Sequence, residues 1–301
     1  MDREGLVLRK LLAVRIETPD GRTLEIHDEG DPNGFPVVVH HGTPMSGLQY
    51  APHVELAREQ GLRLIGYDRP GYGGSTRAAG RAVADCVTDV TAIADAFGLE
   101  RFASWGISGG GPHVLACAAL CDGRLVAAAS LAAVAPYDAD GLDWLAGMGE
   151  GNHIEFGKVL EGEAALRPFL EEEAHGLQNA TPQQLVEQIA TLLGPEDRAV
   201  LTGAFAEYFL EGGRHAFEPG IDGWLDDDVA FMRDWGFRVE QIERPTLLVH
   251  GDDDRFVPVS HGRWLATRIP NVEVRIDAGD GHLTLIERRM HEVNDWLLSH
   301  S

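Results

Sequence analysis

The sequence predicts an α/β protein with a mostly parallel, doubly wound sheet and a helical segment inserted into the chain. Short apolar runs alternate with helical patterns from the first residues to Pro136, and this alternation indicates a parallel sheet covered by helices. It resumes at Pro245, whereas residues 137–240 show helical patterns only. We therefore expect residues 1–136 and 241–301 to form the sheet and its helices, and residues 137–240 to form a separate helical unit.

The first part of the chain supplies most of the expected strands. Continuous apolar runs that end in polar residues are typical of strands buried on both faces of a parallel sheet. Strands are expected at Leu11–Thr18, Thr23–Asp28, Phe35–His41, Leu62–Tyr67 and Leu125–Val134. Helices are expected from a cap at Ser46 to about Gln60, and over Val83–Phe97 with Gly98 as the stop.

The inserted segment and the last part of the chain are predicted from caps and turn residues. A capping box at Thr181 starts a helix that ends at Gly194, and a second helix over Pro195–Leu210 ends at Gly212-Gly213. Two acidic runs, residues 171–173 and 226–228, are expected on solvated helix faces. After this segment the sequence predicts a strand after Pro245, a helix from Pro258, a strand at Val272–Ile276 and a last helix to Leu298.

Composition and charge exclude some classes of partner. The 301-residue chain is 44% hydrophobic and 24% charged, which is ordinary for a globular protein, and its formal net charge is -23. Nucleic acids and anionic membrane surfaces require a basic face, so neither is expected as a partner. A small-molecule substrate is expected instead, and the sequence leaves the oligomeric state open.

The sequence gives no targeting signal. Its first ten residues lack the apolar core and cleavage site of a signal peptide, and no later segment is apolar over a membrane-spanning length. Of the three cysteines, Cys117 and Cys121 lie four residues apart on one expected helix, as small core residues would. The cytoplasm is therefore the expected location.

A serine lies at the apex of a tight turn in the stretch Gly106-Ile107-Ser108-Gly109-Gly110. An apolar run precedes this turn and an alanine-rich helical pattern follows it, which together predict a strand, a sharp turn and a helix. A serine at such an apex takes a strained backbone conformation that small neighbours permit. The N-terminus of the following helix would favour the negative charge that forms when the hydroxyl attacks a carbonyl.

Four motifs occur in a fixed order at the ends of expected strands. They are HHGTP at residues 40–44, GISGG at 106–110, HGDDDRFVP at 250–258 and GDGHLTL at 279–285. In these motifs and their order the chain resembles the α/β-hydrolase superfamily, as a serine hydrolase with a helical cap, and the resemblance covers essentially the whole chain. It implies an α/β-hydrolase core at 1–136 and 241–301, with the cap at 137–240.

The resemblance assigns catalytic roles to three residues. Ser108 would be the nucleophile and His282 the base that takes its proton. The carboxylate that orients the histidine would come from the loop after the strand that begins at Pro245. Asp252, Asp253 and Asp254 all lie there, and Asp138 is a fourth candidate at a position that some relatives use.

We choose Asp254 from these four. The family pattern puts the acid third after the glycine and just before a short run to Val257-Pro258. Asp252 would still lie at the strand end, and Asp253 would point to solvent. Pro258 would begin the next helix, so that Asp254 is held between two fixed elements.

Two backbone N–H groups are needed to stabilise the oxyanion of the tetrahedral intermediate. Gly109 directly follows the nucleophile and should supply one of them. Thr43 should supply the other, because Pro44 has no N–H to donate. The side chains that bind substrate are not identifiable from the sequence.

Other polar residues are expected to be structural. His41 should hold the oxyanion loop, and Trp105 should lie in the core. His113 is expected to be structural, with a place in the site lining as the alternative. The histidines at 40, 41 and 113 show no metal-ligand spacing with a cysteine or carboxylate, so no metal is expected. The glycine-rich loop at residues 68–75 lacks the Lys-Ser/Thr ending of a P-loop, and no cofactor is expected.

The favoured function is hydrolysis of a carboxylic ester, or a related acyl bond, of a small to medium substrate. The serine nucleophile argues against the relatives that use aspartate, the epoxide hydrolases and haloalkane dehalogenases. An aminopeptidase similar to proline iminopeptidases is the alternative, although this chain has HGTP where those have HGGP, and GISGG where they have GGSWG. A ligand-binding receptor that keeps the triad is an alternative of another class.

Overall fold

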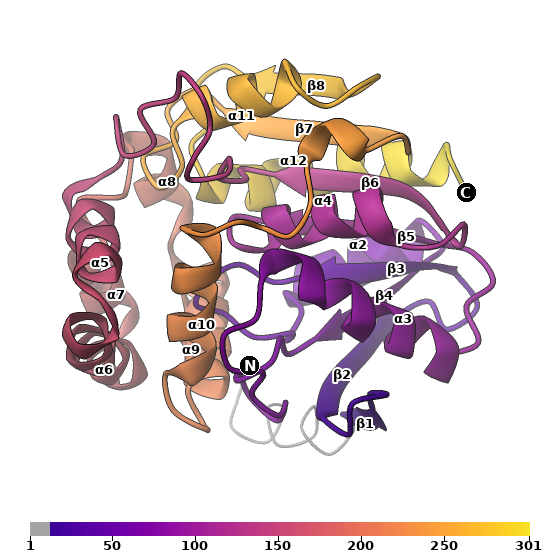
Figure 1. The fold of residues 1–301 in the computed structure, drawn as a ribbon, viewed down its shortest axis with the longest axis horizontal. Helices are drawn as coiled ribbons and strands as arrows, with labels where there is room; N and C mark the ends of the chain where they lie inside the picture. The colour runs from indigo at the N-terminus through magenta and orange to yellow at the C-terminus, as the bar shows by residue number, and fades with distance from the viewer. Residues whose placement is uncertain (1–12) are drawn as a thin grey trace.

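The computed structural model describes residues 13–301, which form an eight-stranded sheet with helices on both faces (Figure 1). Leu11 and Leu12 of the first expected strand, and residues 1–10, in which no signal peptide is expected, lie outside the described residues. The strands are β1 (Val14–Glu17), β2 (Thr23–Gly30), β3 (Phe35–His40), β4 (Leu62–Tyr67), β5 (Phe102–Ile107), β6 (Leu125–Leu131), β7 (Thr246–Gly251) and β8 (Glu273–Asp277).

The sheet is mostly parallel, as the sequence predicts. Its strand order is β1-β2-β4-β3-β5-β6-β7-β8, and every pair from β4 to β8 is parallel, whereas β1 and β2 pair antiparallel at one edge. The carboxyl ends of the parallel strands therefore meet at one edge of the sheet, which is where open α/β sheets bind ligands.

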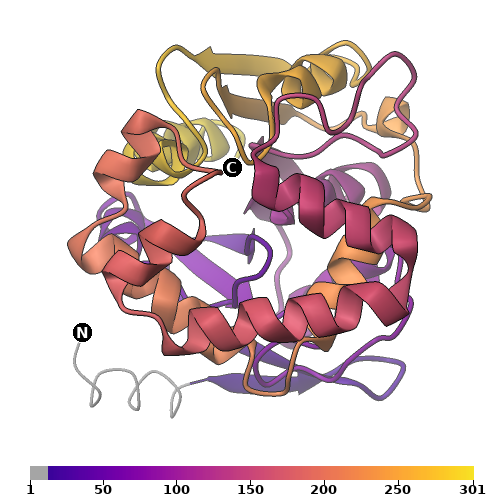
Figure 2. The same cartoon turned by 90° about the vertical axis from the view of Figure 1, so that its left-hand side faces the viewer.

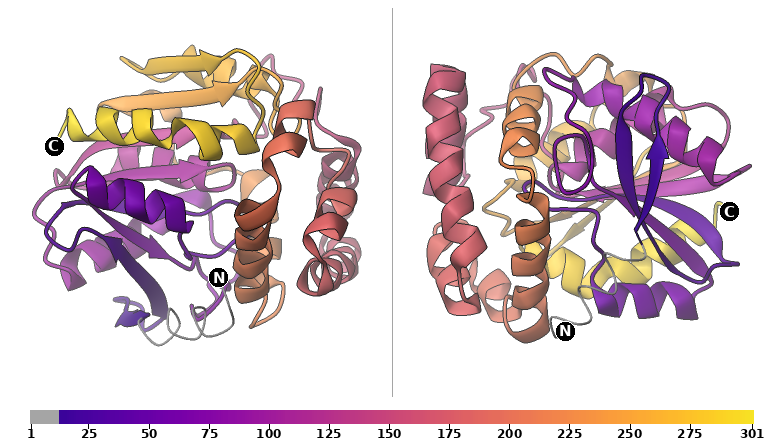
Figure 3. Two further views of the ribbon diagram at one scale, coloured as in Figure 1. Left: turned by 180° about the vertical axis from the view of Figure 1, so that it is seen from behind. Right: turned by 90° about the horizontal axis from the view of Figure 1, so that it is seen from below.

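Helices cover both faces of the sheet, and for this reason β5 and β7 are buried at every residue. Two apolar clusters lie on opposite sides of the sheet. The first includes buried residues of α3 (Cys86–Ala96), α4 (Gly110–Leu120) and α11 (Val259–Ala266). The second includes buried residues of α2 (Ala51–Glu59) and α12 (Leu283–Leu298), which lie in front of the sheet in the left view of Figure 3.

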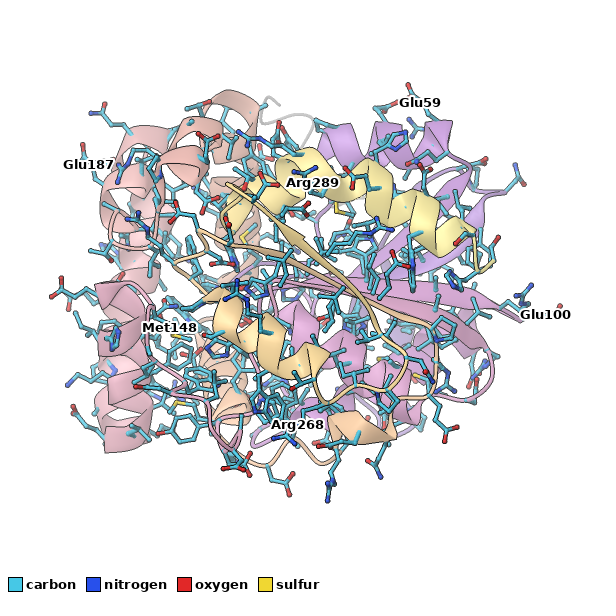
Figure 4. All side chains as sticks on the ribbon, turned by 90° about the horizontal axis from the view of Figure 1, so that it is seen from above. Glu59, Glu100, Met148, Glu187, Arg268 and Arg289 are labelled. Atoms are coloured by element: carbon cyan, nitrogen blue, oxygen red, sulfur yellow. The ribbon has the colours of Figure 1, made fainter. Side chains whose placement is uncertain are left out.

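Between β6 and β7 the described chain contains helices and no strand. These helices lie beyond the edge to which the parallel strands point, in an inner and an outer layer (Figure 1), and Figure 2 views them face-on. They are α5 (Glu150–Glu161), α6 (Glu163–Asn179), α7 (Pro182–Gln188), α8 (Pro195–Val200), α9 (Gly203–Ala216) and α10 (Asp222–Phe231). Glu187 of α7 and Glu100, which precedes β5, lie at opposite ends of the molecule (Figure 4).

Several helix boundaries differ from the sequence prediction because tertiary contacts override local signals. Ser46 does not cap α2; its hydroxyl is buried without a hydrogen-bond partner, and the helix starts after Tyr50. The helix expected to end at Gly194 stops at Gln188, and Gly194 instead precedes α8. The helix expected over Pro195–Leu210 is interrupted at residues 201–202, and α9 then continues through Gly212-Gly213. A Cβ at Gly212 would meet the flexible end of the Met45 side chain, which can shift to make room.

The expectation that both acidic runs lie on solvated faces is wrong for the second one. Asp226, Asp227 and Asp228 of α10 are all buried, at 3%, 0% and 1% exposure. Buried carboxylates require compensating partners. No helix in residues 13–301 is long and apolar enough to cross a membrane.

Candidate active site

Ser108 lies on the turn between β5 and α4 with φ 53°, one of three non-glycine residues with positive φ in the described chain. Such a conformation costs on the order of 1–3 kcal/mol and persists only where surrounding contacts enforce it. Here the Ser108 N–H donates to Leu131 O at 2.9 Å, and Gly111 N–H donates to Ser108 O at 2.8 Å. The turn thus places Ser108 at the N-terminus of α4.

The glycines around Ser108 are required by close packing of the backbone. A Cβ on Gly106 would overlap the carbonyl of Gly110, and a Cβ on Gly110 would overlap the carbonyl of His40. Glycine is the residue that permits such approach. The strand, the turn and the following helix can therefore be this tight only with glycine at both positions.

Asp254 and His282 are hydrogen-bonded to each other. His282 Nδ1 lies 2.7 Å from Asp254 Oδ2, and both side chains are buried. The other carboxylate oxygen, Oδ1, accepts hydrogen bonds from the Phe256 and Val257 N–H groups at 2.9 and 2.8 Å. These bonds fix the carboxylate, which in turn fixes the imidazole with Nδ1 toward the acid and leaves Nε2 for a reacting group.

The electrostatics of His282 favour its protonated form. Burial alone would lower the pKa of His282, but the charge and hydrogen bond of Asp254 and the charge of Asp197 outweigh it, so the pKa is raised. A carboxylate that stabilises the imidazolium is what a general base requires during proton transfer from a hydroxyl.

Asp197 of α8 holds the backbone on which His282 lies. Its Oδ2 accepts from His282 N–H at 2.9 Å, and its Oδ1 accepts from Leu283 and Thr284 N–H at 2.8 and 3.0 Å. These N–H groups at the start of α12 have no partner within the helix, so Asp197 caps this helix from another part of the chain. The burial of Asp197 raises its pKa, and the three backbone bonds oppose that effect.

The backbone N–H groups of Thr43 and Gly109 are free to act as donors. Neither donates a hydrogen bond to any of residues 13–301. The two residues are in contact, since a Cβ on Gly109 would overlap the Thr43 side chain, and both line the same cavity as Ser108. Unpaired N–H groups beside a nucleophile match the requirement for an oxyanion hole.

Asp227 of α10 connects the Thr43 loop to the helical segment. Its Oδ2 accepts from Thr43 Oγ1 at 2.7 Å, from Arg69 Nη2 at 2.6 Å and from Tyr72 OH at 2.9 Å, and its Oδ1 accepts from Arg81 Nη2 at 2.7 Å. Burial opposes ionisation of Asp227, but the two arginines outweigh it and lower its pKa. The carboxylate therefore remains charged at the centre of this network.

A cavity of about 350 Å³ opens onto Ser108, a size suited to a small or medium ligand. Its other walls come largely from the helical segment between β6 and β7. Apolar side chains form much of the lining: Val134, Ile154, Phe156, Phe169, Leu177, Ile189, Leu192, Trp224, Phe231, Phe256 and Val257. Phe256 also stacks on the His282 ring at 4.6 Å between centroids, so one residue of the cavity lining contacts the histidine.

One wall of the cavity is acidic. Glu150, Glu155, Glu173 and Asp228 line it, and no lysine, arginine or histidine does. Trp224 Nε1 donates to Glu155 Oε1 at 2.8 Å, whereas Asp228 Oδ2 has no hydrogen-bond partner within the described chain. Burial raises the pKa of both Glu155 and Asp228. The charge of Glu155 raises the pKa of Asp228 further, whereas a hydrogen bond from Asp228 partly opposes the rise at Glu155.

The remaining sequence candidates lie where structural roles are expected. His41 accepts from Arg69 N–H through Nε2 at 3.1 Å, and its Nδ1 lies 2.7 Å from Gly42 O. His113 contacts Gly109 O at 2.7 Å through Nδ1 and is buried away from the cavity lining, as is Trp105. Asp138 is exposed.

Asp252 and Asp253, the two acids before Asp254, face away from the histidine. Asp252 Oδ1 accepts from Gly279 N–H at 2.7 Å. Asp253 is half-exposed and lies 3.6 Å from Arg255. Asp254 is thus the acid of the DDD run in contact with His282.

Sequence reasoning missed Asp197, Asp227 and the acidic wall of the cavity. Asp227 belongs to a run of three acids, which composition alone assigns to the surface. Asp197 is an ordinary first-turn residue of a short helix. Each acts on a segment distant in the sequence, so no local pattern could reveal it.

Comparison with known proteins agrees with this fold. The family model for the alpha/beta hydrolase fold matches residues 36–162. A non-heme chloroperoxidase of Streptomyces lividans is 32% identical over 254 residues, which covers 81% of this chain and 83% of the relative. A bifunctional esterase/perhydrolase of Acinetobacter calcoaceticus is 26% identical and covers 81% and 84% of the two chains.

Among solved structures, a bromoperoxidase from Bacillus anthracis superposes with a TM-score of 0.70 at 24% identity, covering 96% of this chain and 99% of the other. Fold and relatives together define an enzyme of the α/β class. The chain belongs to the α/β-hydrolase fold family.

Proposed function

We propose that this enzyme is a serine hydrolase that cleaves a carboxylic ester, or a related acyl bond, of a small to medium substrate. The observation that carries the proposal is the 2.7 Å hydrogen bond between Asp254 and His282. Phe256 stacks on His282 and lines the same cavity as Ser108, which lies on a strained turn. The relative named as a bifunctional esterase/perhydrolase supports the same chemistry.

In this proposal each residue has one role. Ser108 Oγ attacks the acyl carbon while His282 Nε2 takes its proton, and Asp254 stabilises the resulting imidazolium. The N–H groups of Thr43 and Gly109 stabilise the oxyanion. His282 then protonates the leaving alcohol, and water attacks the acyl-enzyme by the same steps to release the acid. No cofactor takes part in these steps.

We further propose that residues 137–240 act as a cap that sets specificity, with the core at residues 1–136 and 241–301. Helices of this segment contribute most of the cavity lining, including Phe156, Phe169 and Leu177. The lining is predominantly apolar, which favours an acyl or alcohol group of hydrocarbon character.

A second candidate, an aminopeptidase similar to proline iminopeptidases, is favoured by one specific observation. Carboxyl groups of Glu155 and Asp228 line the cavity without a basic residue among the lining, as a site for a substrate amino group would require. The receptor alternative has no such support, because the relatives above are enzymes.

The two candidates differ in the bond that they cleave. We would assay aryl esters of graded acyl length beside aminoacyl arylamides, with Ser108→Ala as the blank. Ester cleavage without arylamide cleavage is the expected result. Arylamide cleavage that depends on Ser108 would replace the esterase proposal with the aminopeptidase, and cleavage that survives Ser108→Ala would contradict both.

A further inference from the structure

We propose that Glu25, His27, Asp68 and His215 form a structural zinc site between the sheet and the helical segment. Glu25 and His27 come from β2, Asp68 directly follows β4, and His215 lies near the end of α9. Their exposures are 5%, 4%, 0% and 3%. Histidine nitrogen and carboxylate oxygen are both ordinary ligands of Zn²⁺.

The four donor residues lie close enough together to share one ion. One donor atom from each residue lies within 4.8 Å of all the others. His215 Nε2 is 3.0 Å from Asp68 Oδ2 and 3.3 Å from Glu25 Oε1, and His27 Nε2 is 3.3 Å from Asp68 Oδ1. Four ligands about 2.1 Å from a tetrahedral ion are separated by roughly 3.4 Å. The two histidines contact different oxygens of Asp68, so if Asp68 supplies one ligand atom, one histidine must move toward the oxygen that the other contacts.

The arrangement also requires positive charge at its centre. His215 Nε2 faces oxygens of two buried carboxylates, and a bare nitrogen lone pair there would be repelled by both. The position must therefore hold either a proton on the ring or a metal ion. A proton serves one pair of atoms at a time, whereas Zn²⁺ would be bound by all four side chains together.

Neighbouring groups orient two of the proposed ligands, Asp68 and Glu25, as they do around known metal sites. Gly47 N–H donates to Asp68 Oδ1 at 2.8 Å, and Gly74 N–H donates to Asp68 Oδ2 at 3.0 Å. The buried Nδ1 of His215 has no hydrogen-bond partner in the described chain, and its nearest carboxylate, that of Glu218, is 3.6 Å away. Arg15 binds Glu25 through Oε2, which leaves Oε1 for the metal.

The mixed nitrogen and oxygen set selects among metals. Ca²⁺ and Mg²⁺ prefer oxygen ligands only, whereas imidazole together with carboxylate suits Zn²⁺. Four protein ligands complete a tetrahedron and leave no open position for substrate, so the role is structural. The ion would join α9 to β2 and to the loop after β4, and so fix the helical segment on the sheet.

Sequence spacing could not reveal this site. The two histidines are far apart in the chain, and only Glu25 and His27 share an element. The alternation of β2 puts these two side chains on the same face of the sheet. The fold then brings Asp68 and His215 to that face.

The test is metal binding by the full-length chain. The chelator-stripped protein is titrated with ZnCl₂ in competition with a chromogenic chelator, and its Tm is measured with and without zinc. We expect one zinc per chain and a higher Tm when zinc is bound, because the ion binds the folded state. His27→Gln and His215→Gln should each abolish stoichiometric binding, whereas His291→Gln, whose side chain is 64% exposed, should not.

Two results would overturn the proposal: no stoichiometric zinc on the folded wild-type chain, or full binding by both folded variants. If one variant does not fold, the other decides. Cobalt loading of the wild-type chain gives a second readout, because four-coordinate Co²⁺ absorbs visible light far more strongly than six-coordinate Co²⁺. A weak six-coordinate spectrum would likewise exclude this site. These readouts do not depend on ester cleavage, so they remain valid if the proposed function fails.

Discussion

At the scale of single residues, the geometry around His282 distinguishes among acids that the sequence leaves close together. Asp254 accepts two backbone hydrogen bonds through one oxygen and contacts the imidazole through the other. Asp252 is bonded to the Gly279 N–H instead, and Asp138 is exposed. A carboxylate can orient a histidine only if it is itself held in place.

We therefore predict that Asp254→Asn lowers kcat more than the same change at any neighbouring acid. The loss should reach about 10⁴-fold, the size of the equivalent effect in a serine protease, because the amide favours the wrong tautomer of the histidine. The measurement is kcat on one ester for Asp254→Asn, with Asp252→Asn, Asp253→Asn and Asp138→Asn as matched controls. A control that loses more activity than Asp254→Asn would refute this assignment.

The pH dependence of activity should report the same histidine. His282 accepts a proton only when neutral, so kcat/KM should rise tenfold per pH unit on the acid side and then level off. The net effect of Asp254 and Asp197 is to raise the pKa of His282, so the midpoint should lie above the ordinary value of about 6.5. A profile that stays flat from about pH 5 to 9 would exclude a histidine base.

At the scale of elements, α10 supports the oxyanion loop through one carboxylate. Asp227 accepts a hydrogen bond from the Thr43 hydroxyl and forms ion pairs with Arg69 and Arg81, which are both buried. Removing one partner of a buried ion pair leaves an uncompensated charge, which typically costs about 3–5 kcal/mol. The helix therefore contributes both to stability and to the position of a proposed oxyanion donor.

Asp227→Asn should lower the free energy of unfolding by about 3–5 kcal/mol. It should also reduce kcat with little change in KM, since Thr43 would lose the contact that fixes its loop. Asp222→Asn is the matched control, because Asp222 begins the same helix and its partners Arg77 and Arg167 are partly exposed and can be solvated. Denaturant unfolding and steady-state kinetics check both effects, and equal losses in the two variants would count against a special role for Asp227.

The sequence predicts elements well where their signals are local. Continuous apolar runs identify β3, β5 and β7, and glycine spacing identifies the turn at Ser108, because both follow from backbone geometry over a few residues. Local signals fail where distant segments meet. Gly212 and Gly213 lie inside α9 rather than at its end, and Asp227 is buried where two arginines from another part of the chain reach it.

At the scale of the whole molecule, the segment between β6 and β7 does more than cover the cavity. Asp197 caps α12 beneath His282, and Asp227 binds the Thr43 loop. Deleting residues 137–240 would therefore remove both supports along with the cavity wall. Single substitutions in that wall test its proposed role in specificity more cleanly than a deletion.

Leu177→Ala is such a substitution, since Leu177 lines the cavity from α6. The added space should raise kcat/KM for longer acyl esters relative to acetate by about tenfold, the lower end of what a small change in an apolar pocket produces. Leu160→Ala, at a 60% exposed position of α5, is the control. The same ratio of long to short esters in all three proteins would contradict the proposed role of the cap.

Reaction of Ser108 with a fluorophosphonate tests the central claim most directly, because the probe needs an activated serine and no knowledge of the natural substrate. The folded protein is treated with the probe, digested, and the modified peptide is identified by mass spectrometry. We predict one adduct, on Ser108, which is lost in Ser108→Ala and slowed in Asp254→Asn. An adduct on another residue, or none on a folded sample, would contradict the assignment of this enzyme as a serine hydrolase.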